Sequence, residues 1–170
     1  LLDSNMYGDG WFFSGFDRIH EDQTDWCMEK LNKRKVPAMA FFHMPPVEFK
    51  EAYEKMKLGD HSVIYEHGSI GEKDEYFGIS NRPPHFFEKA VDNGWLKWIF
   101  CGHDHLNTLS LTYKGIRMTY GMSIDYLGYS GIAKQYIQRG ATLITRKTDG
   151  NIDINMVPLT TVISTRVRGA

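Results

Sequence analysis

The chain has 170 residues, 42% of them hydrophobic and 24% charged, which is enough to fold as one domain around its own core. Its 20 basic and 21 acidic residues give a formal net charge of -1, which excludes the basic excess typical of proteins that bind nucleic-acid backbones. No stretch approaches the ~20 consecutive apolar residues of a membrane span.

The start of the chain, Leu1-Leu2-Asp3, has neither an initiator Met nor the basic and apolar segments of a signal peptide. We therefore expect a fragment or processed piece of a longer protein, and the sequence leaves the cellular compartment open. Cys27 and Cys101 are its cysteines. Two cysteines do not make a disulfide framework, so we expect free, buried thiols.

The first part of the chain alternates helical and strand patterns. Residues 22–35 predict a helix, because basic residues crowd the end where cations stabilise the helix dipole. Trp26 and Leu31 are expected to face the core from this helix. The apolar run 36–42 then predicts a strand, and a second helix is expected over 46–56, with proline at its start.

The next segment, residues 58–82, shows little periodicity, and we interpret it as a long surface loop. Long loops inside a compact domain are often functional. A third helix is predicted from Pro83 or Pro84 to Val91. The apolar, β-rich run 95–101 then predicts a second buried strand.

Beyond this strand the pattern becomes antiparallel. Residues 106–113 and 116–120 flank a Lys-Gly turn and predict a β-hairpin. Residues 121–140 are rich in Gly and Tyr and predict a loop. A last hairpin is expected from 141–146 and 151–158. This order of elements favours a layered α/β sandwich.

Histidines follow both predicted buried strands. His43 ends the first, and the second runs directly into Gly102-His103-Asp104-His105. The carboxyl ends of strands in open α/β sheets are where ligands bind, so we expect these imidazoles to lie near one another. Neutral imidazole is a good ligand for Zn, Fe, Mn, Co and Ni. The pattern therefore indicates a metal site.

Polar residues beside these histidines have two interpretations each. Asp104 either orients an imidazole as a hydrogen-bond acceptor or is an exposed turn acid. Asn107 either touches substrate or has a turn or strand-edge role. Glu48 is expected to favour the dipole at its helix start, with substrate contact as the alternative. Tyr126 and Tyr129 are expected to pack on the sheet rather than to line a pocket.

Two segments resemble a known family. Phe41-Phe42-His43-Met44-Pro45-Pro46-Val47-Glu48 and Phe100-Cys101-Gly102-His103-Asp104-His105-Leu106-Asn107 resemble the last two signature blocks of the calcineurin-like metallophosphoesterases. The resemblance is closest to the branch related to the purple acid phosphatases. It covers roughly residues 1–158, including the initial Leu1-Leu2-Asp3-Ser4 and the Gly/Tyr-rich segment.

This resemblance implies a layered α/β/β/α sandwich over residues 1–158, incomplete in this chain, followed by a weakly structured tail over 159–170. It implies a hydrolase of phosphate esters, a phosphatase or phosphodiesterase, with two divalent or trivalent metal ions (Fe, Zn or Mn). By position, His43 and His103 would bind one metal and His105 the other.

The family's three earlier blocks, Asp-x-His, Gly-Asp-x-x-Asp and Gly-Asn-His-Asp/Glu, do not occur in the sequence. The chain therefore resembles the C-terminal half of such an enzyme, and no residue is assigned as general acid. We expect little or no phosphatase activity from these residues alone, and self-association through uncovered apolar faces. The alternative function is a non-catalytic domain that binds a metal or a partner.

Overall fold

The computed structural model describes residues 1–7, 15–80, 85–134 and 139–159. Its helices are α1 (Glu21–Arg34), α2 (Val47–Lys57) and α3 (Phe86–Asn93), with short 3-10 turns at Lys73–Glu75 and Ile132–Lys134. Its strands are β1 (Ala38–Phe41), β2 (Val63–His67), β3 (Leu96–Cys101), β4 (Ser110–Tyr113), β5 (Ile116–Tyr120), β6 (Gly140–Arg146) and β7 (Ile152–Pro158). The predicted mixed α/β class is confirmed.

Five strands form one mixed sheet in the order β1-β3-β5-β4-β2. β1, β3 and β5 run parallel, while β4 is antiparallel to both β5 and β2. In the β1–β3 register Phe41 lies opposite Phe100. Because the register brings the ends of β1 and β3 level, the residues that follow them emerge side by side at one edge of the sheet.

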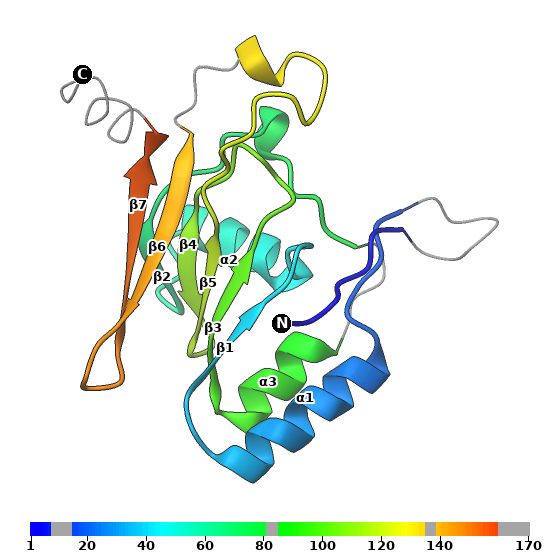
Figure 1. Cartoon of the computed structure of the whole chain (residues 1–170), viewed down its shortest axis with the longest axis vertical. Coiled ribbons are helices and arrows are strands. Elements are labelled where there is room, and N and C mark those ends of the chain that lie inside the picture. Colours follow the sequence, from blue (N-terminus) through cyan, green and yellow to red (C-terminus); the bar gives the residue numbers. More distant parts are fainter. Residues whose placement is uncertain (8–14, 81–84, 135–138, 160–170) are drawn as a thin grey trace, which may run out of the picture.

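Helices α1 and α3 lie together on one side of this sheet, and the β6–β7 hairpin lies on the other (Figure 1). Helix α2 contacts β2 and β4. Phe49, Ile99, Leu111 and Met118 are fully buried in the core. This arrangement is consistent with part of a metallophosphoesterase-type sandwich.

The helix ends follow local chemistry. Helix α1 has acidic residues in its first turn and basic residues in its last, as the helix dipole favours, and it ends on Lys35 in the left-handed conformation. Helix α3 ends on Gly94, whose N–H donates to the Ala90 carbonyl. Leu31 is buried as predicted, but Trp26 is 53% exposed, so its predicted inward position is wrong.

Residues 58–82 are not wholly a loop, because they contain β2. Only Val63 of this strand is buried, whereas Ile64 and Tyr65 are exposed at the edge of the sheet. An edge strand without inward and outward alternation gives no period-2 signal. The predicted helix start at Pro83 or Pro84, and the predicted tail beyond Leu159, lie outside the described residues.

Cys27 and Cys101 are both free, as predicted, although only Cys101 is buried. Among the described helices, none is long and apolar enough to cross a membrane.

Candidate metal centre

The turn after β1 is fixed by backbone and hydroxyl contacts. The Gly102 N–H donates to the His43 carbonyl at 3.0 Å, which extends the β1–β3 pairing past both strands. The buried Ser4 hydroxyl oxygen accepts from the N–H groups of His43 and Met44, at 3.2 and 2.9 Å. These contacts place the His43 imidazole beside the turn that follows β3.

That second turn carries His103 in the left-handed conformation, with φ of 67°. Such a dihedral is uncommon for a residue with a side chain and often marks a functional turn. The Asp104 N–H donates to the Gly102 carbonyl at 2.9 Å within the turn. Gly78 approaches the His103 ring so closely that a Cβ at residue 78 would overlap the imidazole.

The two turns bring His43 and His103 together. Their Nε2 and Nδ1 atoms are 3.3 Å apart, and the rings are nearly perpendicular at 84°. Two imidazole nitrogens bound to one tetrahedral zinc ion at about 2.0–2.1 Å also lie roughly 3.3 Å apart. The spacing of these two nitrogens therefore fits a shared metal ion.

The imidazoles of this pair favour the neutral form, which is the form that binds metals. Burial is the main cause that lowers the pKa of His103 to about 4, and the neighbouring His43 and His105 act in the same direction. Partial burial and His105 also lower the pKa of His43.

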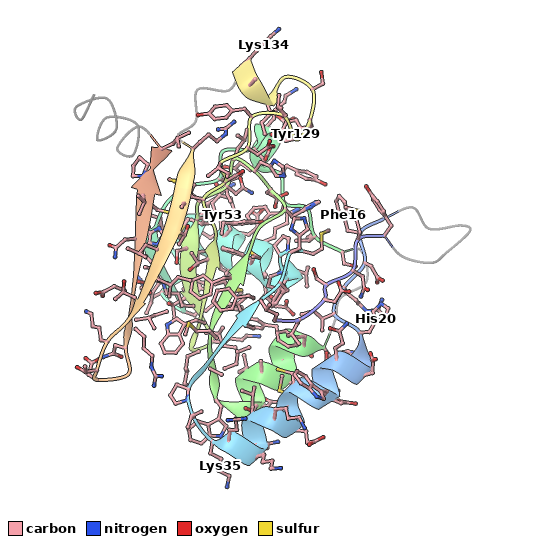
Figure 2. The ribbon with its side chains drawn as sticks, in the orientation of Figure 1. Phe16, His20, Lys35, Tyr53, Tyr129 and Lys134 are labelled. Carbon is pink, nitrogen blue, oxygen red and sulfur yellow. The ribbon has the colours of Figure 1, made fainter. Side chains whose placement is uncertain are left out.

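His105 contacts a different partner from the pair. Its Nδ1 lies 2.7 Å from Oδ2 of Asp125, in the Gly/Tyr-rich segment between β5 and β6. Its ring centroid is 6.0 Å from that of Tyr129. Tyr129 and Phe16 both lie toward the carboxyl ends of the parallel strands (Figure 2). The three candidate ligands thus divide into a pair and a single imidazole.

Asp104 is not the exposed turn acid considered above. It is 5% exposed, and its carboxylate accepts from the Gly78 N–H at 3.0 Å and from the Tyr120 hydroxyl at 2.6 Å. Burial raises its pKa to about 6. Asp104 therefore anchors residues 68–80 against the end of β5.

Asn107 anchors a neighbouring loop, and its contact with substrate stays a prediction. It is fully buried, and its Oδ1 accepts from the N–H groups of Gly71 and Glu72 at 3.0 and 3.1 Å. Its Nδ2 donates to the Tyr76 carbonyl at 3.2 Å. Residues Asp104 and Asn107 together hold the loop after β2 over the histidines.

Sequence reasoning missed two carboxylates, Glu72 and Asp125. Glu72 accepts from the N–H of Leu106 at 3.0 Å and from the Tyr129 hydroxyl at 2.7 Å. Neither acid comes directly after a buried strand, so a search for polar residues at strand ends does not find them. The one usable signal is Asp125 followed by Gly128, because Asp side chains bind backbone N–H groups in such turns.

The predicted packing of the tyrosines is also wrong. Tyr126 and Tyr129 are each 43% exposed rather than buried on the sheet. The ring of Tyr126 covers the Arg139 guanidinium at 5.0 Å, and the Tyr129 hydroxyl reaches Glu72. Glu48 is buried at 7% exposure, with Oε2 lacking a hydrogen-bond partner among the described residues.

A cleft of about 590 Å³ lies near His103, to which it is connected through Phe16 of its wall. Its lining includes Phe16, Lys50, Tyr76 and Phe77. Phe16 also contacts His103 edge-on, with ring centroids 4.4 Å apart. One aromatic side chain therefore belongs both to the cleft wall and to the surroundings of the candidate metal ligands.

The described residues do not assemble a complete metal site. Within them, no group of three or more His, Cys, Asp or Glu side chains is placed to hold a metal ion. His43 and His103 supply two converging nitrogens, whereas a catalytic zinc ion commonly has three protein ligands. The donors present therefore fit part of a metal site by spacing and chemistry.

Comparison with known proteins gives relatives of a single kind. "Probable inactive purple acid phosphatase 28" of Arabidopsis thaliana is 31% identical over 147 residues, which cover 76% of this chain and 34% of that protein. "Probable inactive purple acid phosphatase 29" of the same plant is 26% identical over 143 residues, with the same coverage. The chain is related to the purple acid phosphatases.

This relationship confirms the resemblance described from the sequence. The chain spans about a third of the length of the curated purple acid phosphatases it matches, and the matches lie in the C-terminal part of those proteins. No protein-family model matches the chain, and no solved structure does. Purple acid phosphatases generally use a dinuclear metal centre.

Proposed function

We propose that this chain supplies the histidine ligands of a dinuclear metal centre that hydrolyses phosphate esters. His43 and His103 would hold one ion, and His105 the other. The observation that carries the proposal is the 3.3 Å separation of His43 Nε2 and His103 Nδ1, which suits two ligands of one ion. The relationship to purple acid phosphatases supports the same assignment.

The chain's own residues prepare the ligands in three ways. The β1–β3 pairing brings His43 beside His103, and partial burial keeps both imidazoles neutral. Gly78 leaves room for the His103 ring. When bound, two divalent or trivalent ions (Fe, Zn or Mn) supply Lewis-acid activation of the phosphate ester and of water. The organic part of the ester would lie in the cleft lined by Phe16.

A second function, a metal-binding domain without turnover, has an observation in its favour. The matched relatives are named as "probable inactive" purple acid phosphatases. The described residues also lack a group of three ligands at one point. For residues 1–170 alone we therefore expect metal binding without appreciable hydrolysis.

Metal binding by the full chain tests the ligand assignment. The affinities for Zn²⁺ and Co²⁺ are measured by competition with a chromophoric chelator, in the original chain and in His43→Ala, His103→Ala and His105→Ala. His61→Ala is the matched control, because His61 is exposed on a different loop. We expect each of the three variants, but not the control, to weaken binding at least about 10-fold. Equal affinity in all four variants would remove the assignment.

Hydrolysis of p-nitrophenyl phosphate separates the two functions. We expect purified residues 1–170 with Mn²⁺, Zn²⁺ or Fe³⁺ to give no turnover above the metal ion alone. Sustained turnover that is lost in His103→Ala would instead show that this chain is catalytic by itself.

A further inference from the structure

The contact between His105 and Asp125 defines where the proton of the His105 ring lies. The His105 Nδ1 atom is 2.7 Å from Asp125 Oδ2. An ionised carboxylate only accepts hydrogen bonds, so Nδ1 must carry the hydrogen that is donated. In the neutral ring the lone pair available to a ligand is then on Nε2.

The Asp125 carboxylate is also held by backbone hydrogen bonds. Its Oδ1 accepts from the Leu127 N–H at 2.8 Å and its Oδ2 from the Gly128 N–H at 2.6 Å. Both carboxylate oxygens are therefore occupied as acceptors before the imidazole is counted.

The backbone around Asp125 is also fixed. The Arg139 guanidinium, which is 1% exposed, donates from Nε to the Asp125 carbonyl at 2.7 Å. It donates from a second nitrogen to the Ile132 carbonyl at 3.2 Å. The buried Arg139 side chain thus hydrogen-bonds to two points of the Gly/Tyr-rich segment. The turn that carries the Asp125 side chain is restrained as a result.

Gly128 makes the contact sterically possible. A Cβ at residue 128 would overlap both Asp125 Oδ2 and the imidazole of His105. A larger residue at 128 would therefore have to displace one of the two hydrogen-bonded side chains. On its other side the His105 turn is secured by Glu72, which accepts from the adjacent Leu106 N–H at 3.0 Å.

We propose that Asp125 is a positioning residue that fixes the tautomer and orientation of His105, so that Nε2 is the ligand nitrogen. The proposal rests on the function proposed above, in which His105 binds a metal. A metal-binding histidine usually donates its second ring N–H to such an acceptor, which orients the ring and strengthens it as a ligand. Asp125 acts through His105 and needs no contact with substrate.

The tautomer is tested without metal, in the full chain. Proton–nitrogen correlation spectra of the histidine rings at about pH 8, where imidazole is neutral, identify which nitrogen is protonated. We expect Nδ1–H for His105 in the original chain and a shift toward Nε2–H in Asp125→Ala, which removes the acceptor. Nε2–H in the original chain, or an unchanged Nδ1–H in the variant, would overturn the proposal.

A second variant covers the case in which Asp125→Ala does not fold. Gly128→Ala pushes a methyl group against the hydrogen bond, whereas Gly121→Ala, earlier in the same segment, makes only an ordinary 3.6 Å contact. We expect Gly128→Ala to weaken Zn²⁺ binding about 10–100-fold, with Gly121→Ala unchanged. Equal affinities in the two variants would contradict the proposal.

These measurements test the proposed function and the positioning role of Asp125 independently. Absence of Zn²⁺ binding by the original chain would remove the proposed metal-dependent function and, with it, the ligand role of Nε2. A His105 tautomer that does not depend on Asp125, in a chain that binds Zn²⁺ through His105, would remove only the positioning role.

Discussion

The Tyr129 hydroxyl donates a 2.7 Å hydrogen bond to Glu72, a residue 57 positions away in the chain. The bond joins the loop after β2 to the Gly/Tyr-rich segment that holds Asp125. Glu72 uses its other oxygen to accept from Leu106, next to His105. Two loops from different parts of the sequence are therefore linked at the candidate ligand.

Replacing Tyr129 by Phe removes this link and keeps the ring. Because the side chain is 43% exposed, we expect a loss of only about 1 kcal/mol in the free energy of unfolding. Amide hydrogen exchange should accelerate in residues 122–134 and in 69–76. Tyr126→Phe is the control, since its ring contact with Arg139 does not use the hydroxyl. Equal exchange in both variants would contradict the linking role.

The Tyr120 hydroxyl donates to Asp104 at 2.6 Å, and both side chains are buried. Tyr120→Phe would leave a buried carboxylate with one donor fewer. We expect the free energy of unfolding to fall by about 1–3 kcal/mol, measured by urea denaturation. Tyr53→Phe, which loses a hydroxyl bound to the exposed Glu75, should change it by less than about 1 kcal/mol. A smaller effect for Tyr120 than for Tyr53 would refute this role.

Gly78 lies against the His103 ring, so Gly78→Ala should displace the imidazole from His43. We expect Zn²⁺ affinity to drop about 10-fold or more. Gly102→Ala is the control, because its Cβ would lie 3.6 Å from the His43 ring, an ordinary contact. The comparison is a chelator-competition titration of the two variants. Undiminished affinity in Gly78→Ala would show that the pair tolerates a shifted ring.

Glu48 makes stability depend on pH. Burial raises its pKa from 4.5 to about 7, so the folded state holds this proton more tightly than the unfolded state does. The stability associated with the bound proton is present at low pH and is lost as pH rises from 4.5 through about 7. Glu48→Gln should therefore be as stable as the original chain near pH 4.5 and more stable than the original chain at alkaline pH.

The gain expected for Glu48→Gln at alkaline pH is up to about 3 kcal/mol in the free energy of unfolding. Urea denaturation of both proteins across this pH range measures it. Glu54→Gln serves as control, because Glu54 is exposed on the same helix. A difference between Glu48→Gln and the original chain that stays constant with pH would rule out the buried carboxyl as its source.

The sequence predicts the central sheet well because its signals are local. The run ending at Cys101 is apolar except for Lys97, and β3 forms there. The convergence of His43 and His103 follows from parallel strands, whose carboxyl ends share one edge. These strands and the two histidines can therefore be identified from the sequence without knowing the paths of the loops.

Contacts between loops are where sequence reasoning stops. His105 meets Asp125 across 20 residues of chain, in a segment with no period to fix its path. Strand β2 is not predicted because it lies at the edge of the sheet and only one of its residues, Val63, is buried. His103 adopts the left-handed conformation, although the glycine of this turn is the preceding residue, Gly102. Each miss involves geometry imposed by tertiary contacts rather than by composition.

The 60-residue separation of His43 and His103 has a consequence for folding. Helix α2, strand β2 and helix α3 all lie between them, so the two imidazoles meet only when β1 and β3 have paired across that whole stretch. An ion that binds the pair would select the folded chain and raise its stability with the ion's concentration. The change in melting temperature with zinc concentration would thus report how completely the parallel sheet has assembled.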